Sequence, residues 1–386
     1  MERREDLVIV GAGYSGLTLA LHLGREMAKL SPSKRRRITL IAKEPVQTLQ
    51  CELYKVLRHG KARQLAFLDS LKRLNIRWLE GQVLDINTES RCLRLRSRSE
   101  PLSYSGLVAA NGSEASLPPI EGLSAQIYPA GMIPRRAFLF QKTSDALGIR
   151  MRLSQMKWGA TSNPGDQDQF AVVLGAGPNG LEVAGELASL RQSNPRCRVV
   201  LVDQSSELLP TFSPIARRVL KSQISQLGIE TILGSPVEQC TSQELKIRNG
   251  QVIPWQLLVV CAGSKSRPFW AKDAPPGHWS IGDLDAAQPE NRTAQWAVQQ
   301  AQHVARRILW DWDLGPHPGS FQPQDLGLLI SLGPHHGIGR IGPTRSSSFL
   351  EPFVYGRSVG LLKSSAELRY RTQLRFFREA LNAVWT

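Results

Sequence analysis

The sequence predicts an α/β protein built from two similar units and followed by an amphipathic helical tail. Residues 6–20 and residues 170–187 each run from a short apolar stretch through a glycine-rich turn into an Ala/Leu-rich stretch. Apolar, mostly β-branched runs of this length are typical of strands buried in a parallel sheet, and the stretches that follow them are typical of helices. The tail is predicted by an apolar stripe at helical spacing near the C-terminus.

The two glycine-rich turns carry the first functional signal. Both have GxGxxG spacing, with glycines at Gly11, Gly13 and Gly16 and at Gly175, Gly177 and Gly180. In such a turn the first glycine permits the tight bend, the second lets a pyrophosphate approach the backbone, and the third lets the helix pack closely on the strand. The free N–H groups at the start of the helix then hold the phosphates. We therefore expect two Rossmann-like dinucleotide-binding domains, with electrons passing between two bound nucleotides.

The two units differ at the position expected to bind a ribose, which lies at the end of the second strand. In the second unit that residue is Asp203. Because a carboxylate there repels the extra phosphate of NADPH, we expect NADH; the alternative is that Asp203 only caps the following turn. In the first unit Ala42 takes this position, and Glu44 is the nearest acid, so its contact with the ribose stays open. Glycine turns at Asn111-Gly112 and Gly263 end two further buried strands and are expected to contact a cofactor.

Composition narrows the class of protein. The chain has 386 residues and a formal net charge of +15, and this length corresponds to roughly two to three domains. Its five cysteines are scattered without CxxC spacing, which favours a reducing compartment over a disulfide framework, a zinc site or a redox cysteine pair. No apolar run approaches the roughly 20 residues of a membrane-spanning helix, and the first strand begins too early for a signal peptide. Basic residues are not interleaved with exposed aromatics outside the tail, so we expect no nucleic-acid partner.

The C-terminal tail is the candidate membrane contact. Basic side chains lie between the apolar positions, and a basic amphipathic helix with aromatic anchors suits the surface of an anionic membrane. The alternative is that the stripe packs on the body of the protein or on a second subunit, which leaves a homodimer open. The apolar stripe consists of Leu362, Ala366, Tyr370, Leu374, Phe377, Leu381, Val384 and Trp385.

Seven motifs together resemble those of the type II (non-proton-pumping) NADH:quinone oxidoreductases, which are flavoproteins with two dinucleotide-binding domains. The resemblance covers residues 6–340 and rests on GAGYSG at 11–16, LYKV at 53–56, AANGS at 109–113, LGAGPNGLEVAGELA at 174–188, LVDQSSELLPTFSP at 201–214, IGD at 281–283 and TAQWAVQQ at 293–300. The sequence departs from the family at Ala42, where the ribose acid is usual, and at Asn111, where a threonine is usual.

The resemblance implies FAD in the first unit, NADH in the second, and electron transfer through the flavin to a membrane quinone without proton pumping. It makes Asp283 a ligand of the ribityl chain of the flavin. It also places Ala294, Gln295 and Gln299 beside the flavin ring and the quinone head, and Glu182 near the nicotinamide. Catalytic contributions are therefore expected from Glu182, Gln295 and Gln299, although Glu182 taken without the resemblance fits a helix-surface acid equally well.

These inferences predict a domain layout and a location. We expect a discontinuous FAD-binding domain at residues 1–160 and 256–320, an NADH-binding domain at 168–255, and a C-terminal region at 321–386. The protein is expected to lie peripherally at the cytoplasmic face of a membrane. Two other functions stay open: a soluble NAD(P)H–flavin oxidoreductase with a non-quinone acceptor, and a non-catalytic descendant of the fold, which the two departures from the family suggest.

Overall fold

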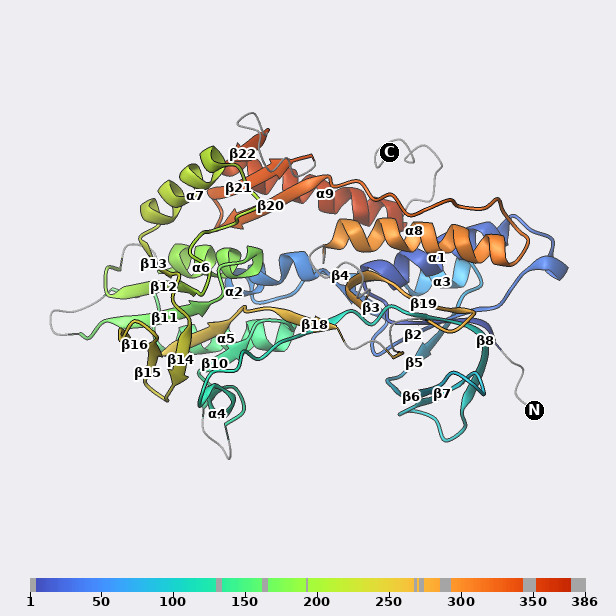
Figure 1. Ribbon diagram of the computed structural model, residues 1–386, viewed down its shortest axis with the longest axis horizontal. Coiled ribbons are helices and arrows are strands. Elements are labelled where there is room, and N and C mark those ends of the chain that lie inside the picture. The colour runs from blue at the N-terminus through green and yellow to red at the C-terminus, as the bar shows by residue number, and fades with distance from the viewer. Residues whose placement is uncertain are drawn as a thin grey trace.

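Two parallel sheets lie side by side along the long axis of the molecule, and a C-terminal layer lies above the junction between them (Figure 1). The computed structural model describes residues 5–129, 134–161, 166–191, 194–266, 269–270, 274–284, 293–342 and 352–375.

The first sheet has the order β5-β2-β1-β8-β7-β6, and β19 also pairs with β8. Strands β5, β2, β1, β8 and β19 are parallel, whereas β7 and β6 extend the sheet in antiparallel fashion. The strands are β1 (Glu5–Val10), β2 (Ile38–Ala42), β5 (Arg77–Glu80), β6 (Val83–Asn87), β7 (Cys92–Leu95), β8 (Leu102–Ala109) and β19 (His278–Ser280).

The second sheet is parallel throughout, with the order β10-β17-β11-β12-β13. One face is covered by helices α5 (Thr143–Gln155), α6 (Pro178–Leu190) and α7 (Pro214–Gln226) in a single core cluster, and the other packs on a small antiparallel meander, β14-β15-β16. The strands are β10 (Ala137–Leu139), β11 (Gln169–Leu174), β12 (Cys197–Asp203), β13 (Ile229–Leu233), β14 (Val237–Cys240), β15 (Glu244–Ile247), β16 (Val252–Pro254) and β17 (Leu257–Val260).

Strand pairing differs from the expected domain boundaries. Residues 137–160 and the strand at 257–260 were expected in the first unit, but β10 and β17 are strands of the second sheet. The physical reason is that all four residues of β17 are buried and apolar, so this strand needs a hydrogen-bonded neighbour on each side. It finds them in β10 and β11, which belong to the second unit.

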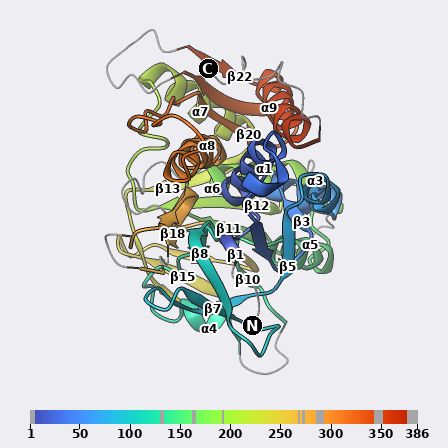
Figure 2. The same ribbon diagram turned by 90° about the vertical axis from the view of Figure 1, so that its right-hand side faces the viewer.

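The helices cover the sheets according to their apolar faces. Helices α1 and α8 pack against each other in the core of the first unit (Figure 2). The longer helices are α1 (Tyr14–Ala28), α5 (Thr143–Gln155), α6 (Pro178–Leu190), α7 (Pro214–Gln226), α8 (Ala294–Asp311) and α9 (Arg357–Arg375). The shorter ones are α2 (Val56–His59), α3 (Leu68–Arg73) and α4 (Leu123–Ile127), with 3-10 turns η1 (Pro32–Lys34), η2 (Gln50–Lys55) and η3 (Gly282–Leu284).

A two-stranded ladder joins the two units. Strands β9 (Ser113–Ala115) and β18 (Ser264–Ser266) pair in antiparallel fashion. Each begins just after a glycine turn that ends a central strand, Asn111-Gly112 after β8 and Gly263 after β17. The ladder therefore brings the carboxyl end of β8 close to the carboxyl end of β17, and cofactors in parallel α/β sheets bind at such ends.

The C-terminal layer consists of an antiparallel sheet and helix α9. Its strands are β20 (Gly327–Leu332), β21 (His336–Ile341) and β22 (Phe353–Tyr355), and a separate hairpin is formed by β3 (Val46–Thr48) and β4 (Gln64–Ala66). Strand β20 packs on α6, and α9 packs on β20, β21 and β22. This layer therefore contacts the helix that carries the second glycine turn.

The structure divides the apolar stripe predicted for the tail. Tyr370 is buried against the body of the protein, as the alternative interpretation had it, whereas Leu362 is 40% exposed. The helix turns a different face inward because Lys363 and Glu367 form ion pairs there. Residues 376–386, which include Phe377, Leu381, Val384 and Trp385, and the side chain of Leu374 lie outside the described part of the structure.

Candidate functional site: two glycine cradles beneath helix α9

The first glycine turn forms a tight cradle at the carboxyl end of β1. Gly11 has φ of +108°, and a Cβ atom there would collide with the backbone of Ala110. A Cβ atom on Gly16 would collide with the carbonyl oxygen of Gly11, whereas one on Gly13 would meet nothing within 4 Å. Helix α1 begins at Gly13 without a side-chain cap, so its first N–H groups remain available to an anion.

The second glycine turn repeats this geometry. Gly175 has φ of +105°, a Cβ atom on Gly180 would collide with the carbonyl oxygen of Gly175, and one on Gly177 would meet nothing within 4 Å. Helix α6 also begins at the middle glycine without a side-chain cap. Each cradle is thus closed behind and open at its middle glycine, which fits the pyrophosphate of a dinucleotide such as FAD or NADH.

Asp203 lies beside the second cradle. Its Oδ2 accepts a hydrogen bond from the Ala176 N–H at 2.6 Å, and its Oδ1 accepts one from the Ser205 N–H at 2.7 Å. The carboxylate therefore fixes the glycine turn and also caps the turn that follows β12. Both roles leave it at the edge of the sheet where a nucleotide ribose would lie.

The first cradle has no acid at the equivalent position. Ala42 is the last residue of β2, and Glu44 lies beyond the strand with an exposed side chain. Glu80, the last residue of β5, is in register with Ala42. Residues in register on parallel strands project to the same face, so Glu80 is a further candidate for the ribose. Sequence reasoning missed it because its position follows only from the pairing of β5 with β2.

Residues of three segments meet beside the first cradle. The hydroxyl of Ser113 donates a hydrogen bond to Asp283 Oδ2 at 2.9 Å, which brings the turn at Asn111 and Gly112 close to the predicted flavin ligand. The N–H of Gly282 donates to the side chain of Gln300 at 2.6 Å and so ties this turn to α8.

The residues predicted at the start of α8 have structural contacts. Gln295 donates to the carbonyl of Gly327 at 2.8 Å, and Gln299 donates to the carbonyl of Gln324 at 2.8 Å. Both side chains also accept backbone N–H groups from the same segment. Their amides therefore fasten the chain that enters β20, while Ala294 is the first residue of the helix and is partly exposed.

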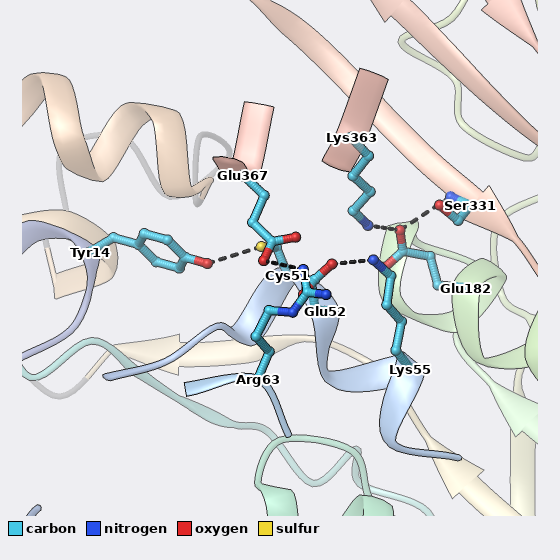
Figure 3. Close-up of polar contacts among 9 residues, drawn as sticks. All are labelled: Tyr14, Cys51, Glu52, Lys55, Arg63, Glu182, Ser331, Lys363 and Glu367. Carbon is cyan, nitrogen blue, oxygen red and sulfur yellow. Dashed lines mark hydrogen bonds and ion pairs between the residues drawn. The ribbon is translucent and has the colours of Figure 1, made fainter. Parts of the chain in front are cut away.

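Glu182 lies on the opposite side of α6 from solvent and is paired with α9. Its Oε1 accepts hydrogen bonds from the Lys363 ammonium and, at 3.2 Å, from the Ser331 N–H (Figure 3). The Lys363 ammonium also lies 4.5 Å from the centre of the Tyr54 ring. Burial raises the pKa of Glu182, against the opposing effect of Lys363. Burial alone would lower the pKa of Lys363, but the charge of Glu182, the Tyr54 hydroxyl and the hydrogen bond to Glu182 together raise it.

The family of the protein is shown by a match between its sequence and the sequence model of a protein family. The model of the pyridine nucleotide-disulphide oxidoreductases matches residues 5–276. The chain belongs to this family. It is therefore an oxidoreductase, and the match agrees with FAD and NADH as the two cofactors expected from the sequence.

Curated relatives and solved structures agree with this assignment. The type II NADH:quinone oxidoreductase Ndh of Mycobacterium tuberculosis is 24% identical over 405 residues, which cover 92% of this chain and 83% of the relative. The structure of NDH2 from Plasmodium falciparum in complex with NADH has a TM-score of 0.74 at 15% identity and covers 97% of each chain. The sulfide:quinone oxidoreductase of Aquifex aeolicus also has a TM-score of 0.74, at 16% identity, covering 96% of this chain and 91% of that one. At these identities the likeness to the two solved structures shows the fold alone.

Among the helices described, none is both long and apolar enough to cross a membrane. The large apolar side chains exposed on α9 are Leu361 (71%), Leu368 (60%) and Leu362 (40%).

Proposed function

We propose that this protein oxidises NADH through bound FAD and reduces a membrane quinone, without pumping protons. One observation carries the proposal: two glycine cradles, each open at its middle glycine, end strands of two sheets that the β9–β18 ladder joins at their carboxyl ends. Two nucleotides held there would lie on either side of this ladder. The name of the Mycobacterium tuberculosis relative, a type II NADH:quinone oxidoreductase, supports NADH as the donor and a quinone as the acceptor.

The chain's contribution is positioning. A bound flavin accepts a hydride from reduced nicotinamide and passes electrons to a quinone. In this proposal Gly13 and the start of α1 hold the pyrophosphate of FAD, Asp283 holds its ribityl chain, and Asp203 holds the ribose of NADH. Glu182 lies near the nicotinamide, where Lys363 keeps its carboxylate oriented and charge-compensated.

The outward face of α9 supplies the membrane contact in this proposal. Leu361 and Leu368 lie seven residues apart and therefore project to the same side of the helix, and exposed Arg357 and Arg369 lie on the same element. Apolar side chains beside basic ones suit the surface of an anionic membrane, here at its cytoplasmic face.

Two single substitutions test the two cradles separately. Because both middle glycines face open space, Gly13→Ala and Gly177→Ala leave the fold intact but put a methyl group where a pyrophosphate would approach. We expect Gly13→Ala to purify without flavin absorbance. Gly177→Ala should keep its flavin and bind NADH more weakly by about tenfold or more, which corresponds to about 1.4 kcal/mol.

The matched control is Gly360→Ala, since Gly360 in α9 also faces open space. This variant should keep both the flavin and the affinity for NADH. The assignment of the cofactors to the cradles is wrong if Gly13→Ala keeps its flavin and Gly177→Ala keeps its affinity for NADH.

A further inference from the structure

Helix α9 is seated on the body of the protein by charged and polar side chains. Lys363, Glu367 and Tyr370 are spaced four and three residues apart and so share one face of the helix. That face is turned inward: the side chains of Lys363 and Glu367 are only 12% and 4% exposed, and Tyr370 is buried. The large leucines of the helix point to solvent instead. Together with Val359, which is fully buried, these polar contacts therefore decide how α9 packs on the body of the protein.

Glu367 meets a second buried carboxylate beneath the helix. We call Glu52, Arg63 and Glu367 the α9 latch (Figure 3). Nη1 of Arg63 lies 2.9 Å from Glu367 Oε1 and 3.3 Å from Glu52 Oε2, so one guanidinium contacts both acids. The side chain of Glu52 is only 2% exposed, and its other oxygen accepts a hydrogen bond from Lys55.

Each acid of the latch has a buried oxygen that lacks a well-aligned hydrogen bond. Among the described residues, Oε2 of Glu367 has no hydrogen-bond donor, and Oε2 of Glu52 has only the Arg63 guanidinium, which lies 3.3 Å away without forming a hydrogen bond. A buried acceptor without a donor is costly, and two carboxylates at one site repel each other when both are ionised. A proton on one of the two acids removes both problems, because a carboxylic acid donates a hydrogen bond that a neighbouring carboxylate accepts.

From this arrangement we infer that Glu52 and Glu367 share a single proton beneath α9, and that this proton positions the helix so that Lys363 reaches Glu182. Glu367 and Glu52 are then positioning residues, acting on Glu182 only through the seat of α9. The relevance of Glu182 to the nicotinamide rests on the proposed function, whereas the proton-linked seating of α9 does not.

The groups around the latch affect the pKa values of Glu367 and Glu52 in opposite directions, which indicates which acid holds the proton. Burial, followed by the hydrogen bond with Glu52, raises the pKa of Glu367 to about 7. Although burial opposes it, hydrogen bonds from Glu367 and Lys55 and the charges of Lys55 and Arg63 lower the pKa of Glu52. The proton therefore belongs to Glu367. The other titratable groups around the latch are Tyr14 on α1, Cys51 and Tyr54 on η2, Glu182 on α6, and Lys363 and Tyr370 on α9.

The sign of the pH dependence follows from Glu367. In an unseated helix its carboxyl is in water and titrates near the ordinary value of 4.5, whereas in the seated helix it titrates near 7. Seating therefore takes up a proton between these two values. The equilibrium constant for the seating of α9 is therefore largest below the lower pKa. It falls by about tenfold for each pH unit between the two pKa values and stays constant above the upper one.

Amide hydrogen exchange along α9 tests this inference and needs neither a cofactor nor a quinone. The exchange rate of each α9 amide in the unmodified protein is divided by its rate in Glu367→Gln at the same pH, which cancels the intrinsic pH dependence. Glutamine reproduces the neutral acid, so the variant's seat should not depend on pH. We expect the ratio to rise by about tenfold per unit between roughly pH 5 and 7 and then to stay level.

Two further variants keep the test decisive. Glu52→Gln removes the carboxylate that shares the proton, so the pKa of Glu367 should fall and the rise should level off at a lower pH than in the unmodified protein, with burial keeping part of the shift. If Glu367→Gln does not fold, the exchange rates of the unmodified protein are divided by those of Glu52→Gln instead, and this ratio should still rise with pH below 7. Glu238→Gln, at an exposed ion pair with Arg248, should keep the rise unchanged. A ratio that stays constant from pH 5 to 8, or a rise in Glu52→Gln that levels off at the same pH as in the unmodified protein, would overturn the inference.

Discussion

At the residue scale, burying the Lys363–Glu182 ion pair costs free energy, and removing one of its two partners costs more. Taking each charge out of water costs several kcal/mol, and the attraction between the two offsets that cost only while both partners are present. The N–H of Ser331 and the ring of Tyr54 add a hydrogen bond and a cation–π contact. A buried pair of this kind stabilises the protein little overall, but it fixes one arrangement of α6, β20 and α9.

Removing one partner of this pair should therefore destabilise the protein strongly. We expect Lys363→Met to lower the free energy of unfolding by about 3–5 kcal/mol, because it leaves Glu182 buried without its counterion. Urea denaturation of the flavin-loaded protein measures this. The double variant Glu182→Gln/Lys363→Met should recover most of the loss. The matched control is Lys29→Met, because Lys29 is exposed and its partner Glu26 is partly exposed, and it should cost no more than about 1 kcal/mol. Equal losses for the two lysines would contradict the account.

The missing ribose acid of the first unit gives a second prediction. Because Glu80 is in register with Ala42, whereas Glu44 lies beyond the end of β2, we expect Glu80→Gln to weaken FAD binding by about tenfold, the effect of losing one charge-assisted hydrogen bond. Glu44→Gln should change the affinity by less than about twofold. Titration of flavin-free protein with FAD, followed by flavin fluorescence, compares the two. The opposite order would return the role to Glu44.

How far the sequence predicts the site also depends on individual residues. The glycine turns are predictable because their backbone requirements are local: Gly11 and Gly175 have positive φ, and a Cβ atom on Gly16 or Gly180 would collide with the carbonyl oxygen five residues earlier. The position of Asp203 is predictable for the same reason, since it is the last residue of its strand. The partner of Glu182 is not predictable, because Lys363 lies 181 residues away in sequence. The sequence of its helix also has apolar side chains on more than one face, so it does not show which face packs inward. Glu52 and Glu367 were missed on the same grounds, as their relation exists only after α9 is seated.

At the element scale, α9 has one face that packs on the body of the protein and another that is exposed to solvent. Its inner face holds Lys363, Glu367 and Tyr370, and its outer face exposes Leu361 and Leu368. The sequence predicts the helix, since apolar residues recur at helical spacing. It does not predict which face turns inward, because both faces carry apolar side chains and the ion pairs that select one of them come from η2, α6 and the chain before β4.

The outer face of α9 gives a prediction about membranes. We expect the double variant Leu361→Glu/Leu368→Glu to bind anionic liposomes more weakly by about tenfold or more, since it replaces apolar contact by charge repulsion. Co-sedimentation with vesicles containing phosphatidylglycerol measures this. Leu147→Glu/Met151→Glu is the matched control, because it alters exposed apolar residues of α5. Equal weakening in both variants would point to net charge alone, and a concentration-dependent mass that the α9 variant abolishes would identify this face as a dimer interface.

At the scale of the whole molecule, the two units are joined so that the carboxyl ends of β8 and β17 meet at one ladder. The repeated strand, turn and helix pattern predicts the two units and their class from sequence. The exact division between them is not predictable, because β17 joins the second sheet through pairing with β11 and β10, which lie 86 and 121 residues before it in sequence. The family model confirms the resemblance that the motifs indicated. The roles of individual site residues stay predictions that the variants above test.

The most direct test of the central claim is the absorbance spectrum of the purified protein under anaerobic conditions. If two nucleotides exchange electrons across the ladder, the protein carries the yellow colour of oxidised flavin, one equivalent of NADH bleaches it, and a water-soluble quinone restores it. A flavin that NADH leaves oxidised, or that a quinone fails to reoxidise after bleaching, would contradict the account.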